Sequence, residues 1–507
     1  MDNLLSKQTL SLTQKVVVHQ EECAVGGEYT LPEYCPDVST ILKCMLHPRI
    51  LNRQQSGDQL LIDGEACVRV LYLDEERKCV RCVEFVLPFS CGVRGIAPEG
   101  MSVPMLRLTT KYVNCRGVTP RRLEVRGAVV MEAQVDETAT CEVMMPVTAD
   151  DLFCKGHQID YTCAVGAVER VLSINEALVF PDNLPPAEML LGGECRCVVK
   201  ECKLLKGKAI VKGEVYVHQL YTDDVKCGNT YPLDYVIPFS QILDLDDVNE
   251  THRFTAQVLI LSDTERCGVG QDGASNVLEF SAKLLVRLLV YQQDIATMVE
   301  DTYHTQCPMD VRCEEISVCE HKGMRFEETM LPLKVELPER DVTDIVDVWV
   351  NPQAISTYAD GGFAHINGRL LVSVLYRDSN GCICFCEQAE EFHIEYPFEC
   401  DSLMADLCVT NLRYRRLEHC LELQVGVWVS LQGIKKNSCT AVCDAKICAD
   451  TPYTAHRSAA MVYYADAGET VWDIGKRCHA SPETICKENN INREVLDNAA
   501  VLIVPMI

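Results

Sequence analysis

Apolar and polar residues alternate along most of the chain, with the two-residue period of a strand that is buried on one face. Residues 421–431 are a clear example, because an apolar side chain occupies every second position from Leu421 to Leu431. Stripes with the 3.6-residue period of an amphipathic helix are scarce before residue 460. The pattern therefore predicts a mostly β chain that is built from antiparallel strands.

A strand-sized segment that begins with glycine and ends with a Leu-Tyr pair occurs three times, at residues 64–72, 213–221 and 368–376. Each copy is followed by a polar turn and by a second segment that ends in a Pro-Phe pair. These pairs are Pro88-Phe89, Pro238-Phe239 and Pro397-Phe398. A strand, a turn and a second strand are therefore predicted in each copy, and the repetition indicates a repeated module.

Two further landmarks flank each copy in the same order. A Leu-Pro pair precedes it, and a Leu-Glu pair follows it at the start of an alternating run. The pairs are Leu31-Pro32, Leu184-Pro185 and Leu337-Pro338, and then Leu123-Glu124, Leu278-Glu279 and Leu421-Glu422. The chain is therefore predicted to contain three tandem antiparallel β modules, each a sandwich or a barrel, at residues 10–160, 161–318 and 319–448.

The pattern changes in residues 449–458, which are polar, contain proline and suit a short linker. Residues 459–507 then predict a small α+β domain with the order strand, helix, helix, strand. The expected elements are a strand at 462–464, a helix at 471–478, a second helix from Pro482 to about Asn489 and a strand at 501–505. Ser481 is expected to be the N-cap of the second helix.

This C-terminal segment resembles a LysM domain. The resemblance is carried by Tyr464, Gly468-Glu469-Thr470-Val471-Trp472-Asp473-Ile474, Ser481-Pro482, Ile485, Asn489, Leu496 and Ile503-Val504-Pro505. It implies a shallow groove for N-acetylglucosamine polymers, or for a protein partner, between the loop before the first helix and the loop after the second. The residues expected to contact the partner or the glycan are Gly468, Glu469, Thr470, Val471, Asn490, Ile491 and Asn492.

The second groove loop departs from the LysM pattern in two places. Asn489-Asn490 stands where the family has a helix-closing Asn-Pro, and the glycine before the last strand is replaced within Asn498-Ala499-Ala500. We expect these changes to loosen the closure of the loop, which a protein interface tolerates better than a sugar groove does. Trp472 is expected to pack in the core of this small domain, and the alternative is that it stacks on a sugar or a partner.

The three β modules, with their Leu-Pro, Leu-Tyr and Pro-Phe landmarks, resemble the SPOCS domain. SPOCS modules followed by one LysM domain are similar to a family of clostridial spore-coat morphogenetic proteins. The resemblance implies a non-enzymatic scaffold that is made in the mother cell and acts at the forespore surface. It also implies a partner similar to stage IV sporulation protein A, the ATPase of the coat's basement layer, and contacts with other coat proteins. The alternative is a protein that binds cell-wall glycan, such as peptidoglycan.

The charge of the chain argues against several other partners. Its 507 residues include 74 acidic and 47 basic side chains, which gives a formal net charge of −27. Such a chain repels the phosphates of nucleic acids and of anionic lipids. The N-terminus has no basic segment followed by an apolar one, and no later stretch has the length of a membrane-spanning helix. We therefore expect a cytoplasmic protein with no nucleic-acid partner and no membrane insertion.

The sequence contains no catalytic signature of the phosphate-binding loop, zinc protease or serine hydrolase type. We accordingly expect no catalytic residues, no cofactor and no metal, since the histidines do not show helical ligand spacing. The 30 cysteines are expected to stay reduced and to act as small core residues. The closest groups are Cys79 with Cys82, Cys195 with Cys197, and Cys382, Cys384 and Cys386; a metal cluster and cross-linking of the coat are the alternatives.

Overall fold

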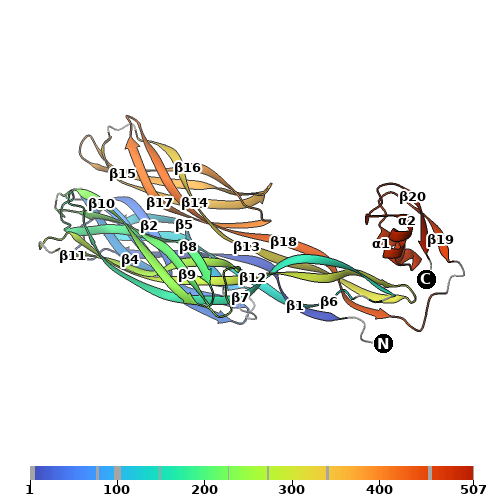
Figure 1. Cartoon of the computed structure of the whole chain (residues 1–507). Coiled ribbons are helices and arrows are strands. Elements are labelled where there is room, and N and C mark those ends of the chain that lie inside the picture. The colour runs from blue at the N-terminus through green and yellow to red at the C-terminus, as the bar shows by residue number, and fades with distance from the viewer. Residues whose placement is uncertain are drawn as a thin grey trace.

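The computed structural model describes residues 6–75, 79–95, 104–147, 149, 151–226, 228–270, 273–338, 342–454 and 459–505. Within these residues, three β modules are followed by a small unit that contains two helices (Figure 1). Module 1 consists of β1 (Lys7–Thr30), β2 (Val38–Ser56), β3 (Gln59–Asp74), β4 (Val80–Arg94), β5 (Met105–Thr119) and β6 (Arg122–Met144). Module 2 consists of β7 (Leu152–Val179), β8 (Met189–Leu205), β9 (Lys208–Thr222), β10 (Thr230–Asp244), β11 (Arg253–Gly268) and β12 (Val277–His304). Module 3 consists of β13 (Met309–Glu336), β14 (Val342–Asp360), β15 (Phe363–Asp378), β16 (Ile383–Pro397), β17 (Ser402–Arg416) and β18 (Cys420–Ile447).

The three modules share one topology. In each, the second, third and fourth strands form a meander, and the last strand lies between the first and the fifth. All pairings are antiparallel. The two sheets of a module enclose one apolar core, to which both sheets contribute. The prediction of a mostly β chain with antiparallel modules is confirmed.

The repeated Leu-Tyr pair has a clear structural meaning. Successive residues of a strand point to opposite faces. Tyr72, Tyr221 and Tyr376 therefore lie in the cores of their own modules. Leu71, Leu220 and Leu375 point the other way, into one apolar cluster that all three modules share. The modules are thus packed around a common centre and do not form a string of separate domains.

The first and last strands of each module continue beyond the sandwich and form what we call the stalk. It consists of residues 7–18 with 134–144, 152–164 with 291–304, and 309–321 with 434–447. Its apolar core contains Leu10, Leu12, Val143, Ile159, Tyr161, Ala296, Met298, Ile316, Val318 and Ala441. Each of the three ribbons contributes to this core, and the stalk extends toward the C-terminal unit (Figure 1).

The predicted module boundaries differ from the structural repeat. The boundary at 160/161 falls inside β7, and the boundary at 318/319 falls inside β13. In the structure the second and third repeats begin at Leu152 and Met309. The stalk explains the difference, because its ribbons are buried against one another and their alternation continues without a turn across both predicted boundaries.

The glycine of each repeated segment faces a phenylalanine of the next strand. A Cβ atom on Gly64 or on Gly213 would lie 2.4 Å from the ring of Phe89 or Phe239, so only glycine fits at these positions. In module 3 the corresponding partner of Gly368 is Phe392. The interpretation of Pro397-Phe398 as the third Pro-Phe landmark was wrong, because the short turn after β15 brings Phe392 into register.

One Leu-Pro landmark was also misplaced. The residue that follows the first strand donates its backbone N–H to the residue before the last strand in all three modules. These donors are Leu31, Phe180 and Leu337. The equivalent of Leu31-Pro32 in module 2 is therefore Phe180-Pro181, and Leu184-Pro185 lies farther along the same turn.

The cysteines depart from the expectation at one pair. Cys23 of β1 and Cys91 of β4 form a disulfide across the core of module 1, where their Cα atoms are 6.0 Å apart. The two strands belong to different sheets, so the disulfide joins both layers of the sandwich. Among the other cysteines, Cys384 and Cys386 pack against the core of module 3, as expected of small apolar residues.

The C-terminal unit, which we call the head, has the predicted order of elements. It contains β19 (Ala460–Ala465), α1 (Val471–Cys478), α2 (Pro482–Asn489) and β20 (Ala500–Pro505). Thr470 caps α1 and Ser481 caps α2, each accepting a backbone N–H of the first turn. The predicted bounds of both helices are confirmed. Across the described part of the chain, no helix has the length and apolarity needed to cross a membrane.

Candidate interaction surfaces

The two loops of the head that the sequence singled out lie side by side. Gly468 donates its N–H to the carbonyl of Leu496 at 2.7 Å, and Val471 donates to Glu494 at 2.8 Å. Leu496 in turn donates to the carbonyl of Glu469 at 3.0 Å. The first loop and the segment before β20 are therefore joined by backbone hydrogen bonds.

Two of the predicted contact residues have partners inside the head. The Glu469 carboxylate accepts the backbone N–H of Asp466 at 2.9 Å, and the Arg477 guanidinium donates to it at 2.9 Å. These two donors lower the pKa of Glu469. The Thr470 hydroxyl accepts the N–H of Asp473 at 3.0 Å as the cap of α1. Both side chains thus hold the first loop in place, and neither lines the groove described next.

A groove of about 710 Å³ lies between the start of α1, α2 and the segment that follows α2. It is lined by Val471, Trp472, Pro482, Glu483, Cys486, Lys487, Asn490, Ile491, Asn492, Arg493 and Glu494. Four of the predicted contact residues are among these: Val471, Asn490, Ile491 and Asn492. Gly468, Glu469 and Thr470 lie outside the lining. Asn490 and Asn492 are exposed and present polar groups to the groove.

The expectation that the second loop is loosely closed was wrong. Asn490 adopts the left-handed conformation, with φ of 53°, and closes α2 with an N–H that donates to Cys486. The Asn489 side chain donates to the carbonyl of Ile503 at 2.7 Å and accepts the N–H of the same residue at 2.7 Å. Asn490 tolerates this backbone conformation, and the Asn489 side chain supplies both hydrogen bonds to Ile503. The loop is therefore held without the family's proline and glycine.

Trp472 does not belong to the core of the head, contrary to our expectation. Its indole N–H donates to the Asp301 carboxylate of β12 at 2.8 Å, and its ring meets Tyr303 edge-on with 5.0 Å between the centroids. Lys476 donates to the same carboxylate at 2.6 Å. The side chain points outward from α1, and its role in this structure is to attach the head to the stalk.

Further contacts complete this attachment. The Tyr303 hydroxyl donates to the carbonyl of Ala480 at 2.7 Å in a buried position. Tyr453 of the predicted linker stacks on His479 of the head, with 3.7 Å between the centroids, and donates its N–H to the carbonyl of Gln306. The first part of the linker is thus bound to both units, and residues 455–458 lie outside the described residues.

Sequence reasoning missed an apolar face on the head. Val462 pairs with Ile503, and Tyr464 pairs with Val501, across β19 and β20. Their side chains are 58%, 50%, 78% and 62% exposed, respectively. Cross-strand neighbours share a face of the sheet, so these four residues form one exposed patch, the ribbon face. The signal in the sequence was that both strands carry apolar residues at consecutive positions, more than one buried face needs.

Polar contacts link the three modules in a closed ring. The residue five positions after the repeated glycine is Arg69 in module 1, His218 in module 2 and Ser373 in module 3. The three contacts of this ring join Arg69 to Glu265 of module 2 at 3.2 Å, His218 to Asp347 of module 3 at 2.9 Å, and Ser373 to Lys43 of module 1 at 2.7 Å. Each module therefore contacts the next one through the same position of the repeat.

The pKa values at this junction reflect its burial. Burial and the adjacent Asp263 raise the pKa of Glu265 to about 7, against the opposing effect of Arg69. Burial lowers the pKa of His218, yet Asp347 and Asp234 raise it well above the usual value. His218 contacts one carboxylate with each ring nitrogen, at 2.7 and 2.9 Å, which suits the imidazolium form.

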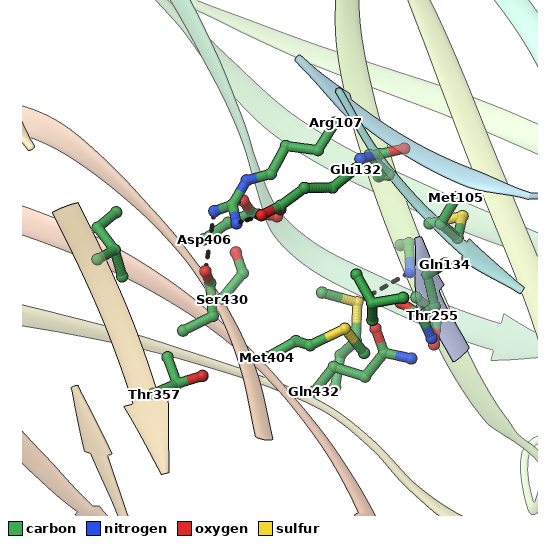
Figure 2. A pocket seen from close by; sticks show the side chains of 16 residues that line it. Met105, Arg107, Glu132, Gln134, Thr255, Thr357, Met404, Asp406, Ser430 and Gln432 are labelled. Atoms are coloured by element: carbon green, nitrogen blue, oxygen red, sulfur yellow. Dashed lines mark hydrogen bonds and ion pairs between the residues drawn. The ribbon is translucent and has the colours of Figure 1, made fainter. Parts of the chain in front are cut away.

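A cavity of about 190 Å³ lies where the modules meet (Figure 2). Arg107 of β5 extends into it, contacting Glu132 of β6 at 3.3 Å and Asp406 of β17. The same guanidinium donates to the carbonyl of Ala405 at 2.9 Å. The cationic group is thus matched by two carboxylates and a carbonyl, and the cavity acts as a polar joint between modules 1 and 3.

Two segments of the chain match a family model described as SipL, SPOCS domain. They are residues 37–120 and 186–262, which cover β2 to β5 of module 1 and most of the corresponding strands of module 2. The chain therefore carries SPOCS domains. No curated protein matches the chain. No solved structure matches it either. Module 3 lies outside the matched segments and repeats the strand order of the other two.

Proposed function

We propose that this protein is a non-enzymatic scaffold of spore coat assembly, in which the three modules hold the head for binding to another coat protein. The match to the SPOCS domain supports a role in sporulation. The order of elements in the head supports its resemblance to a LysM domain. The single observation that carries the binding role is the ribbon face, where Val462, Tyr464, Val501 and Ile503 leave an apolar patch exposed.

The partner that the resemblance favours is a basement-layer ATPase similar to stage IV sporulation protein A. An exposed cross-strand patch with a central tyrosine is the kind of surface on which a protein interface concentrates its affinity. A scaffold with this partner would act in the mother cell at the forespore surface. Other coat proteins would then bind the modules, whose three similar sandwiches offer separate surfaces.

The second candidate is binding of cell-wall glycan in the groove of the head. Asn490 and Asn492 favour it, because exposed amide groups beside an apolar floor can orient a sugar. The two candidates use different surfaces. A protein partner that binds the ribbon face need not touch Asn492, and a glycan in the groove need not touch Tyr464.

Binding measurements on the full chain separate these candidates. We expect Tyr464→Ser combined with Val501→Ser to weaken capture of the purified ATPase at least about tenfold. Tyr34→Ser is the matched control, because Tyr34 is an exposed tyrosine of module 1, 86% accessible. Asn492→Ala combined with Ile491→Ser should leave this capture unchanged. The proposal is contradicted if only the groove variant loses binding and the ligand that it no longer binds is a chitin oligosaccharide or peptidoglycan.

A further inference from the structure

Two histidines and a glutamate lie together on the outer face of module 3. His365 of β15 is the cross-strand partner of Glu395 of β16, and His393 lies two residues before Glu395 on the same strand. The intervening residues Ile366 and Ile394 point into the core of the module. The three polar side chains therefore share the outward face of one hairpin, although they are separated in the sequence.

The donor atoms of these side chains converge. A nitrogen of each histidine and an oxygen of Glu395 all lie within 4.8 Å of one another. The Glu395 carboxylate oxygen is 3.8 Å from His365 Nδ1 and 3.9 Å from His393 Nε2. Ligand atoms around a tetrahedral Zn²⁺ with bonds of 2.0–2.1 Å are about 3.3–3.5 Å apart. Closing the cluster around an ion thus requires each imidazole nitrogen to approach the Glu395 oxygen by about half an ångström, and two of the three side chains, His393 and Glu395, are exposed.

Second contacts orient both imidazoles. His393 Nδ1 lies 2.6 Å from the side-chain oxygen of Asn367, which accepts its proton and leaves Nε2 with a free lone pair toward Glu395. His365 is stacked between the rings of Tyr358 and His393, with centroid separations of 4.7 and 5.5 Å. Its Nδ1 is buried and makes no hydrogen bond. A buried ring nitrogen that makes no hydrogen bond and lies 3.8 Å from a carboxylate oxygen is suited to a cation.

We propose that His365, His393 and Glu395 bind one divalent transition-metal ion of the Zn²⁺ class. The two imidazole nitrogens are borderline ligands, which favour Zn²⁺ or Ni²⁺ over Mg²⁺ or Ca²⁺, and a carboxylate oxygen is a common third ligand of Zn²⁺. Three protein ligands leave the fourth position open to solvent, because His393 and Glu395 are exposed.

The site is a property of module 3 alone. The positions that correspond to His365, His393 and Glu395 are Leu61, Ser90 and Gly92 in module 1, and Ile210, Ser240 and Ile242 in module 2. Neither set can hold a metal. The hairpins are otherwise equivalent in register, with a glycine opposite a phenylalanine in each. The metal ligands are thus an addition to a common frame.

Metal binding to the full chain tests this proposal. Equilibrium dialysis against Zn²⁺, with a reductant that does not bind metal, should show one ion more per chain for the wild type than for His393→Ala. His157→Ala is the matched control, since His157 is an exposed histidine of the stalk, and it should bind as the wild type does. Thermal unfolding of each variant without metal confirms that the fold is retained.

Two further measurements distinguish this site from the cysteines. Co²⁺ bound at the site should give the absorption of nitrogen and oxygen ligands, without thiolate charge-transfer bands, and this signal should vanish in His365→Ala. Asn367→Ala removes only the residue that orients His393, and we expect affinity about 10–100-fold weaker. Equal stoichiometry and affinity in wild type and His393→Ala would overturn the proposal, as would a Co²⁺ spectrum dominated by thiolate.

Discussion

The three modules and the head are stabilised in different ways. The modules share two apolar cores, one at their common centre and one in the stalk, so each module lacks part of its own core without the other two. The head has a complete small core of its own and meets the stalk mainly through Asp301, Tyr303 and the side chains that contact them. The comparison predicts that the three modules, which we call the body, unfold as one unit. The head, in contrast, can be released from the stalk while it stays folded.

The strongest test of this difference removes a side chain from the shared centre. Leu220 is 1% exposed and contacts residues of the other modules. Leu220→Ala should lower the free energy of unfolding by about 2–5 kcal/mol. All three modules should be destabilised together in chemical denaturation. Val236→Ala, at an exposed position of β10, is the control and should change stability by less than about 1 kcal/mol. Separate transitions for each module would contradict the shared core.

The corresponding change in the head should act locally. Ile474 is fully buried in the core of the head. Ile474→Ala should destabilise that unit by about 2–5 kcal/mol. Hydrogen exchange should then increase in α1 and α2 while the protection of β3, β9 and β15 stays as in the wild type. Equal loss of protection in the body would show that the two regions unfold together.

The body should also respond to pH through Glu265, whose pKa burial raises to about 7 in the folded state from about 4.5. Between these values the folded protein binds the proton and the unfolded chain does not. The contribution of Glu265 to the free energy of unfolding is therefore fully present below about pH 4.5. It decreases as pH rises through 7, by up to about 3 kcal/mol. Glu265→Gln should flatten the pH dependence of the unfolding free energy over this range, whereas the exposed Glu201→Gln should not. An unchanged slope in the first variant would contradict this assignment.

The sequence predicted the local features of both regions far better than their contacts. Both helices of the head followed from Ser481-Pro482 and from the apolar spacing of Val471, Ile474 and Cys478, because caps and periodicity are local signals. The Leu-Tyr repeat predicted a strand in each module. It did not show that Leu71, Leu220 and Leu375 meet, because alternation reveals two faces but not what covers them. Trp472 was misassigned for the same reason, since its partner Asp301 lies on module 2, outside the head.

For the candidate sites too, the sequence predicted local structure better than it predicted contacts. Gly468 to Thr470 and Asn490 to Asn492 lie in two adjoining loops, because the strand-helix order fixes where those loops lie, whereas Val471 is the first residue of α1. Which of them line the groove depends on hydrogen bonds such as that from Arg477 to Glu469, which a pattern does not reveal. The cluster of His365, His393 and Glu395 was missed because its spacing is that of two paired strands, and the register of a hairpin is set by its turn.

The smallest expected effect concerns the joint between head and body. Asp301→Asn keeps the shape of the side chain and removes the charge that Trp472 and Lys476 contact. Hydrogen bonds to a charged group contribute about 1.5–3 kcal/mol, and part of the Lys476 contribution is screened by water, so we expect a loss of about 1–2 kcal/mol in docking. The head itself should stay folded, as should the head of Trp472→Phe, because neither residue belongs to its core.

Segment-resolved hydrogen exchange should then show faster exchange at Ala480 and Tyr303, with α2 unchanged. Asp310→Asn, at an exposed position of β13, is the control. Unfolding of the head in Asp301→Asn would mean that the stalk is part of its core, and the distinction between a collective body and an autonomous head would fail.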